Sequence, residues 1–245
     1  MKMRTGSALA LAALLNAGLL LVAVDAAAQQ GSSRRESADR FRRGDPGAVV
    51  AAQMALSRQA QEKGQWTAIA EAAADSAIMF APGQVRAKDW LKRQANPAQP
   101  MRWQPHQVWA SCDGTLAVST GAWQRADGTA GSFTTVWQRQ RRGAYKWLMD
   151  LTEQQDLPLA EPDMIGGSVA ECQPTPGWRP PSRDRDRDIP PAGAPVCEGG
   201  TCSGASADGT LAYTYSTSAT GGRALTVQLR QQGEMREVTR VSSRE

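Results

Sequence analysis

The chain has 245 residues, of which 41% are apolar, 21% charged and 6% aromatic, and its formal net charge is +4. This length suffices for one domain of ordinary size with attachments, or for two small domains, and the ordinary apolar and charged content excludes wholesale disorder. The net charge is concentrated near the N-terminus, which argues against the basic folded face that nucleic-acid binding requires.

The first 28 residues have the pattern of a secretory signal peptide. Lys2 and Arg4 precede an apolar stretch at residues 8–24, and three alanines at 26–28 supply the small residues of a cleavage site. An uncleaved anchor is the alternative, but the apolar run is about as short as a spanning helix can be. We therefore expect a mature chain that begins at Gln29, does not span a membrane, and is exported to the periplasm or the cell exterior.

A basic leader is predicted at residues 29–44. Its five arginines and two acidic residues account for the whole net charge of +3 that remains once Lys2, Arg4 and Asp25 are removed with the signal peptide. The rest of the mature chain is formally neutral. We expect a solvated, disordered leader, with contact to anionic membranes or envelope polymers as the alternative.

The chain has four cysteines, Cys112, Cys172, Cys197 and Cys202. An even number of cysteines in an oxidising compartment predicts disulfides, and four cysteines allow three pairings. Cys197 and Cys202 flank a short flexible loop whose closure costs little entropy, so we favour Cys197–Cys202 together with Cys112–Cys172. A structural zinc site is the alternative for this spacing, but the chain has a single histidine, and we expect no metal.

The main domain is predicted at residues 45–157, which hold seven of the eight tryptophans. Asp45 followed by Pro46 is a strong helix start, and apolar residues then recur at helical spacing up to Gly64. A second helix is expected to follow from Trp66.

The remainder of this domain changes to a β pattern. A short strand at 76–81 and a short helix at 85–94 come first. Four strands follow, separated by Asp-Gly or Arg-Gly turn signals, at 103–110, 115–124, 132–140 and 144–153. Helices followed by an antiparallel run of strands predict an α+β fold in which the helices cover one face of a curved sheet.

Two further parts are predicted after the main domain. Residues 158–196 hold nine of the fourteen prolines and an alternating Arg-Asp run at 183–188, which predicts a linker, with a docking site for a partner as the alternative. Residues 197–245 contain three short strand patterns. A module of this size rarely holds a core alone, so we expect a small β meander that is stapled by its disulfide or leans on the main domain.

Three stretches of the main domain carry a family resemblance. They are AAADSAIMFAPG at 72–83, KDWL at 88–91, and FTTVWQR at 133–139 followed by GAYKW at 143–147. In this order and spacing they resemble the nuclear transport factor 2-like superfamily, especially its SnoaL-like bacterial members, over residues 45–155. The resemblance implies a cone-shaped curved antiparallel sheet with a pocket between sheet and helices, and a possible homodimer. Its members include isomerases, cyclases, dehydratases, epoxide hydrolases and proteins without any chemistry.

The chain departs from the steroid isomerase-like members at two places. Their carboxylate base lies just before the Pro-Gly turn, where this chain has Phe80 and Ala81. The tyrosine of their first helix is also missing, because the tyrosines here are Tyr145, Tyr213 and Tyr215. Asp75 matches an acidic position common in the family, and we expect it to end the second helix or to order the following turn.

Two side chains remain as candidates for acid–base catalysis, His106 and Asp150. His106 follows Pro105 at a strand start, where an exposed or hydrogen-bonded histidine is the commoner outcome. Asp150 lies on the last strand of the main domain, and a one-residue shift of register decides whether it faces the pocket. We expect Asp150 to face solvent. The sequence has no nucleophile motif and no phosphate-binding glycine loop, so we expect no cofactor.

Most aromatic residues of the main domain fall on odd positions of their strands, and odd positions of one strand share a face. The pattern predicts an aromatic core or a pocket for an apolar ligand; the expected pocket residues are Trp66, Trp109, Trp123, Trp137 and Trp147. We favour an exported, non-catalytic protein that binds a small apolar ligand or a protein partner. The alternatives are a small lyase, isomerase or hydrolase that uses Asp150 or His106, and a structural envelope protein.

Overall fold

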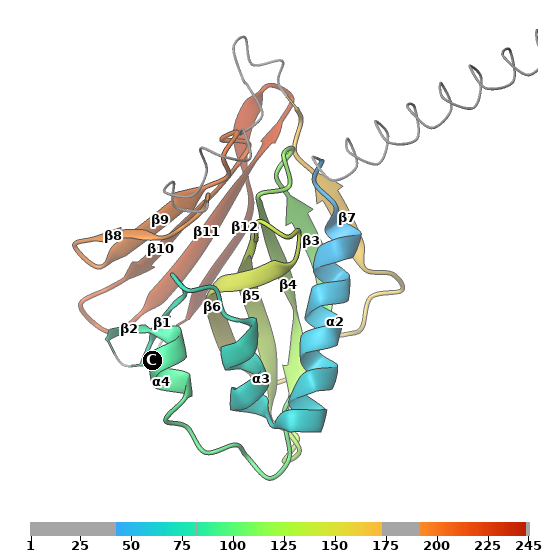
Figure 1. The fold of residues 1–245 in the computed structure, drawn as a ribbon, viewed down its shortest axis with the longest axis vertical. Helices are drawn as coiled ribbons and strands as arrows, with labels where there is room; N and C mark the ends of the chain where they lie inside the picture. Colours follow the sequence, from blue (N-terminus) through green and yellow to red (C-terminus); the bar gives the residue numbers. More distant parts are fainter. Residues whose placement is uncertain (1–42, 82, 173–191, 244–245) are drawn as a thin grey trace, which may run out of the picture. The chain divides into compact units, whose positions relative to one another are not determined.

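The computed structural model in Figure 1 describes residues 43–81, 83–172 and 192–243. These residues form a mixed α+β fold with three helices and two five-stranded sheets, together with a two-stranded hairpin. The predicted signal peptide, nearly all of the predicted leader and the Arg-Asp run at 183–188 lie outside the described residues.

The first described helix, α2 (Pro46–Lys63), begins where the sequence predicts. Asp45 Oδ1 accepts a hydrogen bond from the backbone amide of Ala48 at 3.2 Å, which caps the helix N-terminus. Gly64 has φ of 96°, in the left-handed region that favours glycine, and so separates α2 from α3 (Gln65–Ala72). The buried side chains of α2 recur at helical spacing and pack on the first sheet.

A short hairpin, β1 (Ile78–Phe80) and β2 (Gln84–Arg86), precedes α4 (Ala87–Leu91). The strand predicted at 76–81 is present in a shorter form, but the helix predicted at 85–94 begins later than expected. Val85 pairs with Met79 across the hairpin, so the first residues of the predicted helix belong to strand β2 instead.

The first sheet has the strand order β6-β5-β4-β3-β7. Its antiparallel strands lie close to the predicted ranges; they are β3 (Arg102–Ala110), β4 (Leu116–Gln124), β5 (Ala130–Arg139) and β6 (Tyr145–Gln155). The glycines of the three predicted turns, Gly114, Gly128 and Gly143, have φ of 67°, 88° and 88°. The edge strand β7 (Gly166–Val169) pairs with β3 in parallel, although it falls within the range expected to be a linker.

The second sheet has the strand order β12-β11-β10-β9-β8, and every pair in it is antiparallel. Its strands are β8 (Val196–Glu198), β9 (Thr201–Ala205), β10 (Leu211–Thr217), β11 (Arg223–Gln231) and β12 (Glu234–Ser243). Cys197 and Cys202 pair across β8 and β9 and form a disulfide, and the other disulfide joins Cys112 to Cys172. Both pairs are those that the sequence favoured.

The two sheets share one hydrophobic core. Val118 and Val136 are fully buried on the face of the first sheet that points away from α2. They belong to the same buried cluster as Tyr213, Leu225 and Val227 of the second sheet. The C-terminal residues therefore lean on the main domain instead of holding a core of their own.

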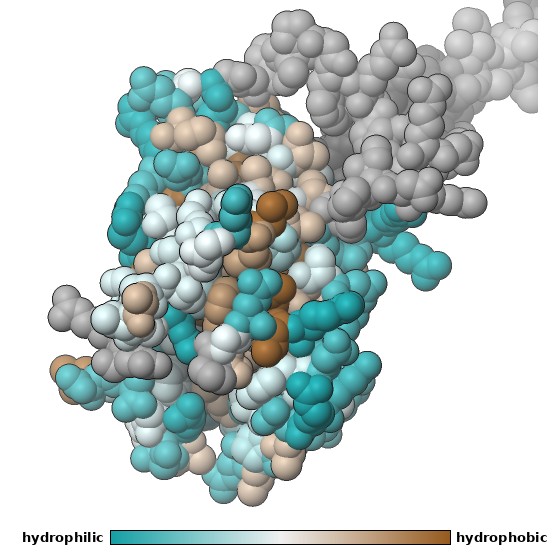
Figure 2. Space-filling model, turned by 90° about the vertical axis from the view of Figure 1, so that its left-hand side faces the viewer, coloured by the Kyte–Doolittle hydropathy of each residue, from teal (hydrophilic) through white to brown (hydrophobic). Residues whose placement is uncertain are grey.

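The face of the molecule in Figure 2 is largely hydrophilic at its flanks. On the face shown in Figure 2, apolar residues gather in a strip near the centre, between hydrophilic flanks. The most exposed large apolar side chains are Leu157, Met164 and Val196, and none of them lines the cavity described below. Scattered exposure of this kind is ordinary for a folded protein.

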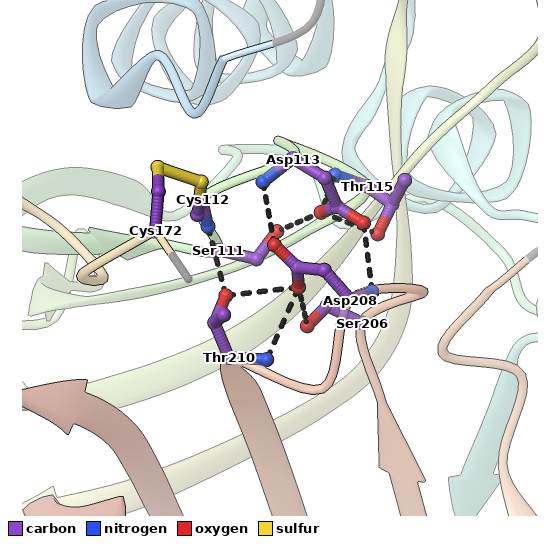
Figure 3. Close-up of a disulfide and its surroundings, with 8 residues drawn as sticks. All are labelled: Ser111, Cys112, Asp113, Thr115, Cys172, Ser206, Asp208 and Thr210. Atoms are coloured by element: carbon purple, nitrogen blue, oxygen red, sulfur yellow. Dashed lines mark hydrogen bonds between the residues drawn. A yellow bond between two sulfur atoms is a disulfide. The ribbon is translucent and has the colours of Figure 1, made fainter. Parts of the chain in front are cut away.

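Two turns of similar six-residue sequence, one in each sheet, contact each other. The turn between β3 and β4 has the sequence SCDGTL at 111–116, and the turn between β9 and β10 has SADGTL at 206–211. In each turn the aspartate accepts hydrogen bonds from the serine hydroxyl two residues before it and from the threonine amide and hydroxyl two residues after it. The two turns lie against each other beside the Cys112–Cys172 disulfide (Figure 3).

The contacts between the two turns are reciprocal. The Cys112 amide donates to Thr210 Oγ1 at 2.9 Å, and the Ala207 amide donates to Thr115 Oγ1 at 3.0 Å. The two aspartates exchange a second pair of hydrogen bonds. The arrangement is therefore close to two-fold symmetric, with each turn offering the other the same donors and acceptors.

The sequence repeat continues into the strand that follows each hairpin, which is β5 after β3 and β4, and β11 after β9 and β10. Residues 135–140 have the sequence TVWQRQ and residues 226–231 have TVQLRQ. The Arg139 amide donates to the Thr115 carbonyl at 2.9 Å, and the Arg230 amide donates to the Thr210 carbonyl at 2.8 Å. The two sheets thus share a local structural repeat of a hairpin and the strand that follows it.

Candidate functional site

A cavity of about 460 Å³ lies between the helices and the first sheet. It is lined from α2, α3 and the helix-facing side of β3 to β6. Six aromatic side chains form much of its wall: Trp66, Trp103, Trp123, Phe133, Trp137 and Trp147. Trp123, Phe133, Trp137 and Trp147 are each less than 5% exposed, so these rings belong to the core and to the cavity wall at the same time.

An irregularity in β3 decides which of its tryptophans reaches the cavity. Trp103 pairs with Trp123 on β4, but the register shifts between Pro105 and Gln107, where His106 is the extra residue. Beyond this bulge the even positions of β3 take the helix-facing side. Trp109 therefore lies on the opposite face, and the cavity contains Trp103 in the place where we expected Trp109.

A second irregularity places Asp150 in the cavity. Val136 pairs with Met149 and Trp137 pairs with Trp147, so Leu148 is an extra residue in β6. In an uninterrupted strand Trp147 and Asp150 would lie on opposite faces, but the bulge brings both to the helix-facing side. The expectation that Asp150 faces solvent is therefore wrong.

The Asp150 carboxyl group is surrounded by protein apart from the surface that it shows to the cavity. Thr135, its neighbour on β5, donates a hydrogen bond from Oγ1 to Asp150 Oδ1 at 2.5 Å. Burial raises the pKa of Asp150 from 3.8 to about 6, and the hydrogen bond from Thr135 acts in the opposite direction. The group can therefore be protonated or ionised near neutral pH.

Charged and polar side chains complete the lining. Arg125 lies over the Trp123 ring, with its guanidinium carbon 5.1 Å from the ring centre. Asp127 lies on the turn that follows, and hydrogen bonds from Thr129 lower the pKa of Asp127. Asp127 is thus an ionised group of the cavity lining at neutral pH, whereas the pKa of Asp150 is shifted in the opposite direction.

The other candidate residues lie outside the cavity. His106 occupies the β3 bulge, and burial lowers the pKa of His106, so the imidazole is neutral at pH 7. Asp75 pairs with Lys88 at 2.5 Å, which lowers the pKa of Asp75 and fits a role in ordering the turn after α3. Phe80 stacks on Tyr215 of the second sheet with ring centres 4.3 Å apart.

None of the three tyrosines lines the cavity. The Tyr145 hydroxyl donates to the Gly114 carbonyl at 2.7 Å, and the Tyr213 hydroxyl donates to the Gly193 carbonyl at 2.9 Å. These two hydroxyl groups therefore stabilise the backbone at Gly114 and Gly193.

Within the described ranges, no group of three or more His, Cys, Asp or Glu side chains is placed to hold a metal ion. In the same part of the chain, no helix has the length and apolar character needed to cross a membrane.

Comparison with known proteins gives distant structural similarity. No protein-family model and no curated protein matches the chain. A crystal structure described as a "putative ketosteroid isomerase" from Parabacteroides distasonis is similar with a TM-score of 0.37 and 14% sequence identity. The similarity covers 47% of this chain and 97% of that one.

Proposed function

We propose that the protein binds a small, largely apolar, ring-containing ligand in the aromatic cavity, with Asp150 as its polar anchor. The observation that carries the proposal is the combination of six aromatic side chains with the Asp150 carboxyl group in a cavity of about 460 Å³. Ligand sites in proteins have this size and this balance of apolar wall and few polar groups. A concave site between helices and sheet favours a small molecule over a protein partner.

A proton-transfer reaction is the second candidate function. A general acid or base works best when its pKa lies near the working pH, and the pKa of Asp150 is about 6. Asp150 would then move a proton at a carbon or oxygen atom of a ligand held by the tryptophans, as an isomerase or lyase does. Exchange of the C2 protons of 1-tetralone in D2O tests this function: parent protein should accelerate it, and Asp150→Asn should abolish the acceleration.

The two disulfides support an exported protein, periplasmic or extracellular, because such bonds persist in oxidising compartments. A homodimer remains a prediction.

The binding proposal is tested with two substitutions on the same strand. Tetralin, a bicyclic hydrocarbon, is titrated into ¹⁵N-labelled protein while the tryptophan indole signals are followed. Trp103→Leu should weaken tetralin binding by about tenfold, because the variant loses one ring of the cavity wall. Trp109→Leu, on the opposite face of β3, should leave the affinity unchanged. Failure of both tetralin and 1-tetralone to bind, or equal effects of both substitutions, would contradict the proposal.

A further inference from the structure

A short chain of hydrogen bonds under the aromatic wall fixes the orientation of Gln53. The Trp137 indole nitrogen donates to Ser119 Oγ at 2.9 Å, and Ser119 Oγ donates to Gln53 Oε1 at 3.1 Å. An indole N–H can only donate, so Ser119 Oγ accepts from Trp137, and the single proton of the hydroxyl group goes to Gln53 Oε1. The carboxamide oxygen of Gln53 therefore faces Ser119, and its NH2 group points elsewhere.

The free NH2 group of Gln53 belongs to the cavity. Gln53 is 4% exposed and lines the cavity from α2. Among the described residues its Nε2 has no hydrogen-bond partner, and the rest of the side chain is enclosed by protein. Gln53 Nε2 is not among the fully buried polar atoms without a partner, so it keeps some accessible surface, and the residue lines the cavity. A ligand in the cavity would therefore meet this donor and supply its partner.

The side-chain amide of Gln65, at the start of α3, is oriented in the same way, with its oxygen bonded to protein. The Met101 backbone amide, which can only donate, gives its hydrogen bond to Gln65 Oε1 at 2.8 Å. Gln65 is 6% exposed and also lines the cavity, so its NH2 group is a second donor without a partner in the described part of the chain. Trp103 Nε1, on the same wall, is a buried donor that likewise has none there.

The NH2 group of Gln53 and the carboxyl group of Asp150 lie at the two ends of one row of neighbouring residues that runs across the first sheet. Ser119 on β4 pairs with Thr135 on β5, and Thr135 pairs with Asp150 on β6. Neighbouring strands are about 4.8 Å apart, so Ser119 and Asp150 are separated by about 10 Å at the backbone. Gln53 is bonded to the Ser119 end of this row.

We propose that Gln53 is the specificity-determining residue of the cavity, and that its NH2 group donates to an acceptor atom at one end of a ring-containing ligand whose other end faces Asp150. The acceptor is a carbonyl or ether oxygen or a ring nitrogen, and Gln65 and Trp103 supply further donors for the same ligand. This inference rests on the binding function proposed above. A hydrocarbon ligand would leave these donors buried and unpaired, and sites built to form hydrogen bonds discriminate against such analogues.

Three ligands of similar shape test the inference: tetralin, 1-tetralone, which adds a carbonyl oxygen, and 6-hydroxy-1-tetralone, which adds a hydroxyl group on the other ring. Dissociation constants come from the indole signals of ¹⁵N-labelled protein. Parent protein should bind 1-tetralone about tenfold more tightly than tetralin, although the ketone is the less apolar compound. The hydroxyl group should add to the affinity because it can donate to Asp150.

Two variants and one control assign the preference to Gln53. Gln53→Met removes the NH2 group at similar length and should abolish the preference for the ketones while tetralin binds as before. Gln53→Glu keeps an acceptor for Ser119 but replaces the donor by an oxygen, so ketone binding should weaken above the pKa of the new carboxyl group. Gln59→Met, on the same helix and outside the cavity, should change none of the three affinities.

The possible outcomes separate the two proposals. Equal binding of tetralin and 1-tetralone to parent protein overturns the inference and leaves the binding function standing. Absence of binding by all three compounds overturns both. If Gln53→Met proves too unstable to titrate, the comparison in parent protein and in Gln53→Glu decides the matter.

Discussion

The backbone amide of Asp113 donates a hydrogen bond to Asp208 Oδ2 at 2.9 Å, and the amide of Asp208 donates one to Asp113 Oδ2 at 3.0 Å. The two residues are far apart in sequence, yet each completes the hydrogen bonding of the other's turn. Because each carboxylate also orders its own Ser and Thr neighbours, a change at one aspartate affects one turn directly and the other through the exchanged bonds. The pair therefore couples the first sheet to the second (Figure 3).

Asp208→Ala should lower the free energy of unfolding by about 2–3 kcal/mol, because the substitution removes four hydrogen bonds that end on one carboxylate. Urea denaturation measures the effect. The matched control is Asp127→Ala, in an Asp-Gly turn where the carboxylate accepts from Thr129 and, among the described residues, bonds to no second turn; its cost should be about 1 kcal/mol or less. Equal losses in the two variants would show that the contact between the turns contributes nothing.

The two disulfides should differ in their contribution to stability. A meander that depended on its own disulfide would loosen first on reduction, but the shared core favours a single unfolding transition for both sheets. Loop entropy predicts a loss of about 4 kcal/mol for the double Ala variant of Cys112–Cys172, which spans 60 residues, and about 2 kcal/mol for that of Cys197–Cys202, which spans 5.

Two probes during denaturation check this prediction. Seven of the eight tryptophans lie in the main domain and none lies in the second sheet, so tryptophan fluorescence follows chiefly the main domain, while far-ultraviolet circular dichroism follows both sheets. The two signals should change together in both variants. Separate transitions, or a larger loss for Cys197–Cys202, would contradict the shared core.

Local features were predictable from the sequence because a few neighbouring residues determine them. Asp45 and Pro46 carry their own capping chemistry, and Gly114 and its counterparts supply the positive φ of the hairpin turns. The faces of Trp109 and Asp150 were not predictable in this way. The bulges at His106 and Leu148 shift the alternation of inward and outward residues, and such bulges depend on how neighbouring strands twist and pair.

Contacts between distant segments were also missed, for two different reasons. The repeat of SCDGTL and SADGTL is visible in the sequence and could have indicated two equivalent turns. That these turns bind each other depends on the tertiary arrangement. Strand β7 is short and begins with two glycines, so its local pattern does not indicate a strand, and its pairing with β3 comes from the open edge of the sheet.

Asp150→Asn should make the protein more stable at neutral pH. The pKa of Asp150 is raised to about 6, so the folded protein disfavours the ionised form, and the parent loses stability as the pH rises from about 4 to about 6. Asparagine keeps the shape and can still accept from Thr135, but it does not ionise. The variant should exceed the parent by about 3 kcal/mol at pH 7 and match it below pH 4.

Asp127→Asn is the control with the opposite sign. Hydrogen bonds from Thr129 lower the pKa of Asp127, so its ionised form stabilises the fold above pH 4 and this contribution disappears as the pH falls through the lowered pKa. The Asn variant should therefore be less stable than the parent at pH 7 and equal to it in strong acid. Urea denaturation between pH 3 and pH 8 measures both differences, and NMR titration of the Asp150 carboxyl carbon gives its pKa directly. A titration at or below pH 4, or an Asp150→Asn variant that is less stable than the parent at pH 7, would remove the shifted acid from the cavity and with it the case for proton transfer.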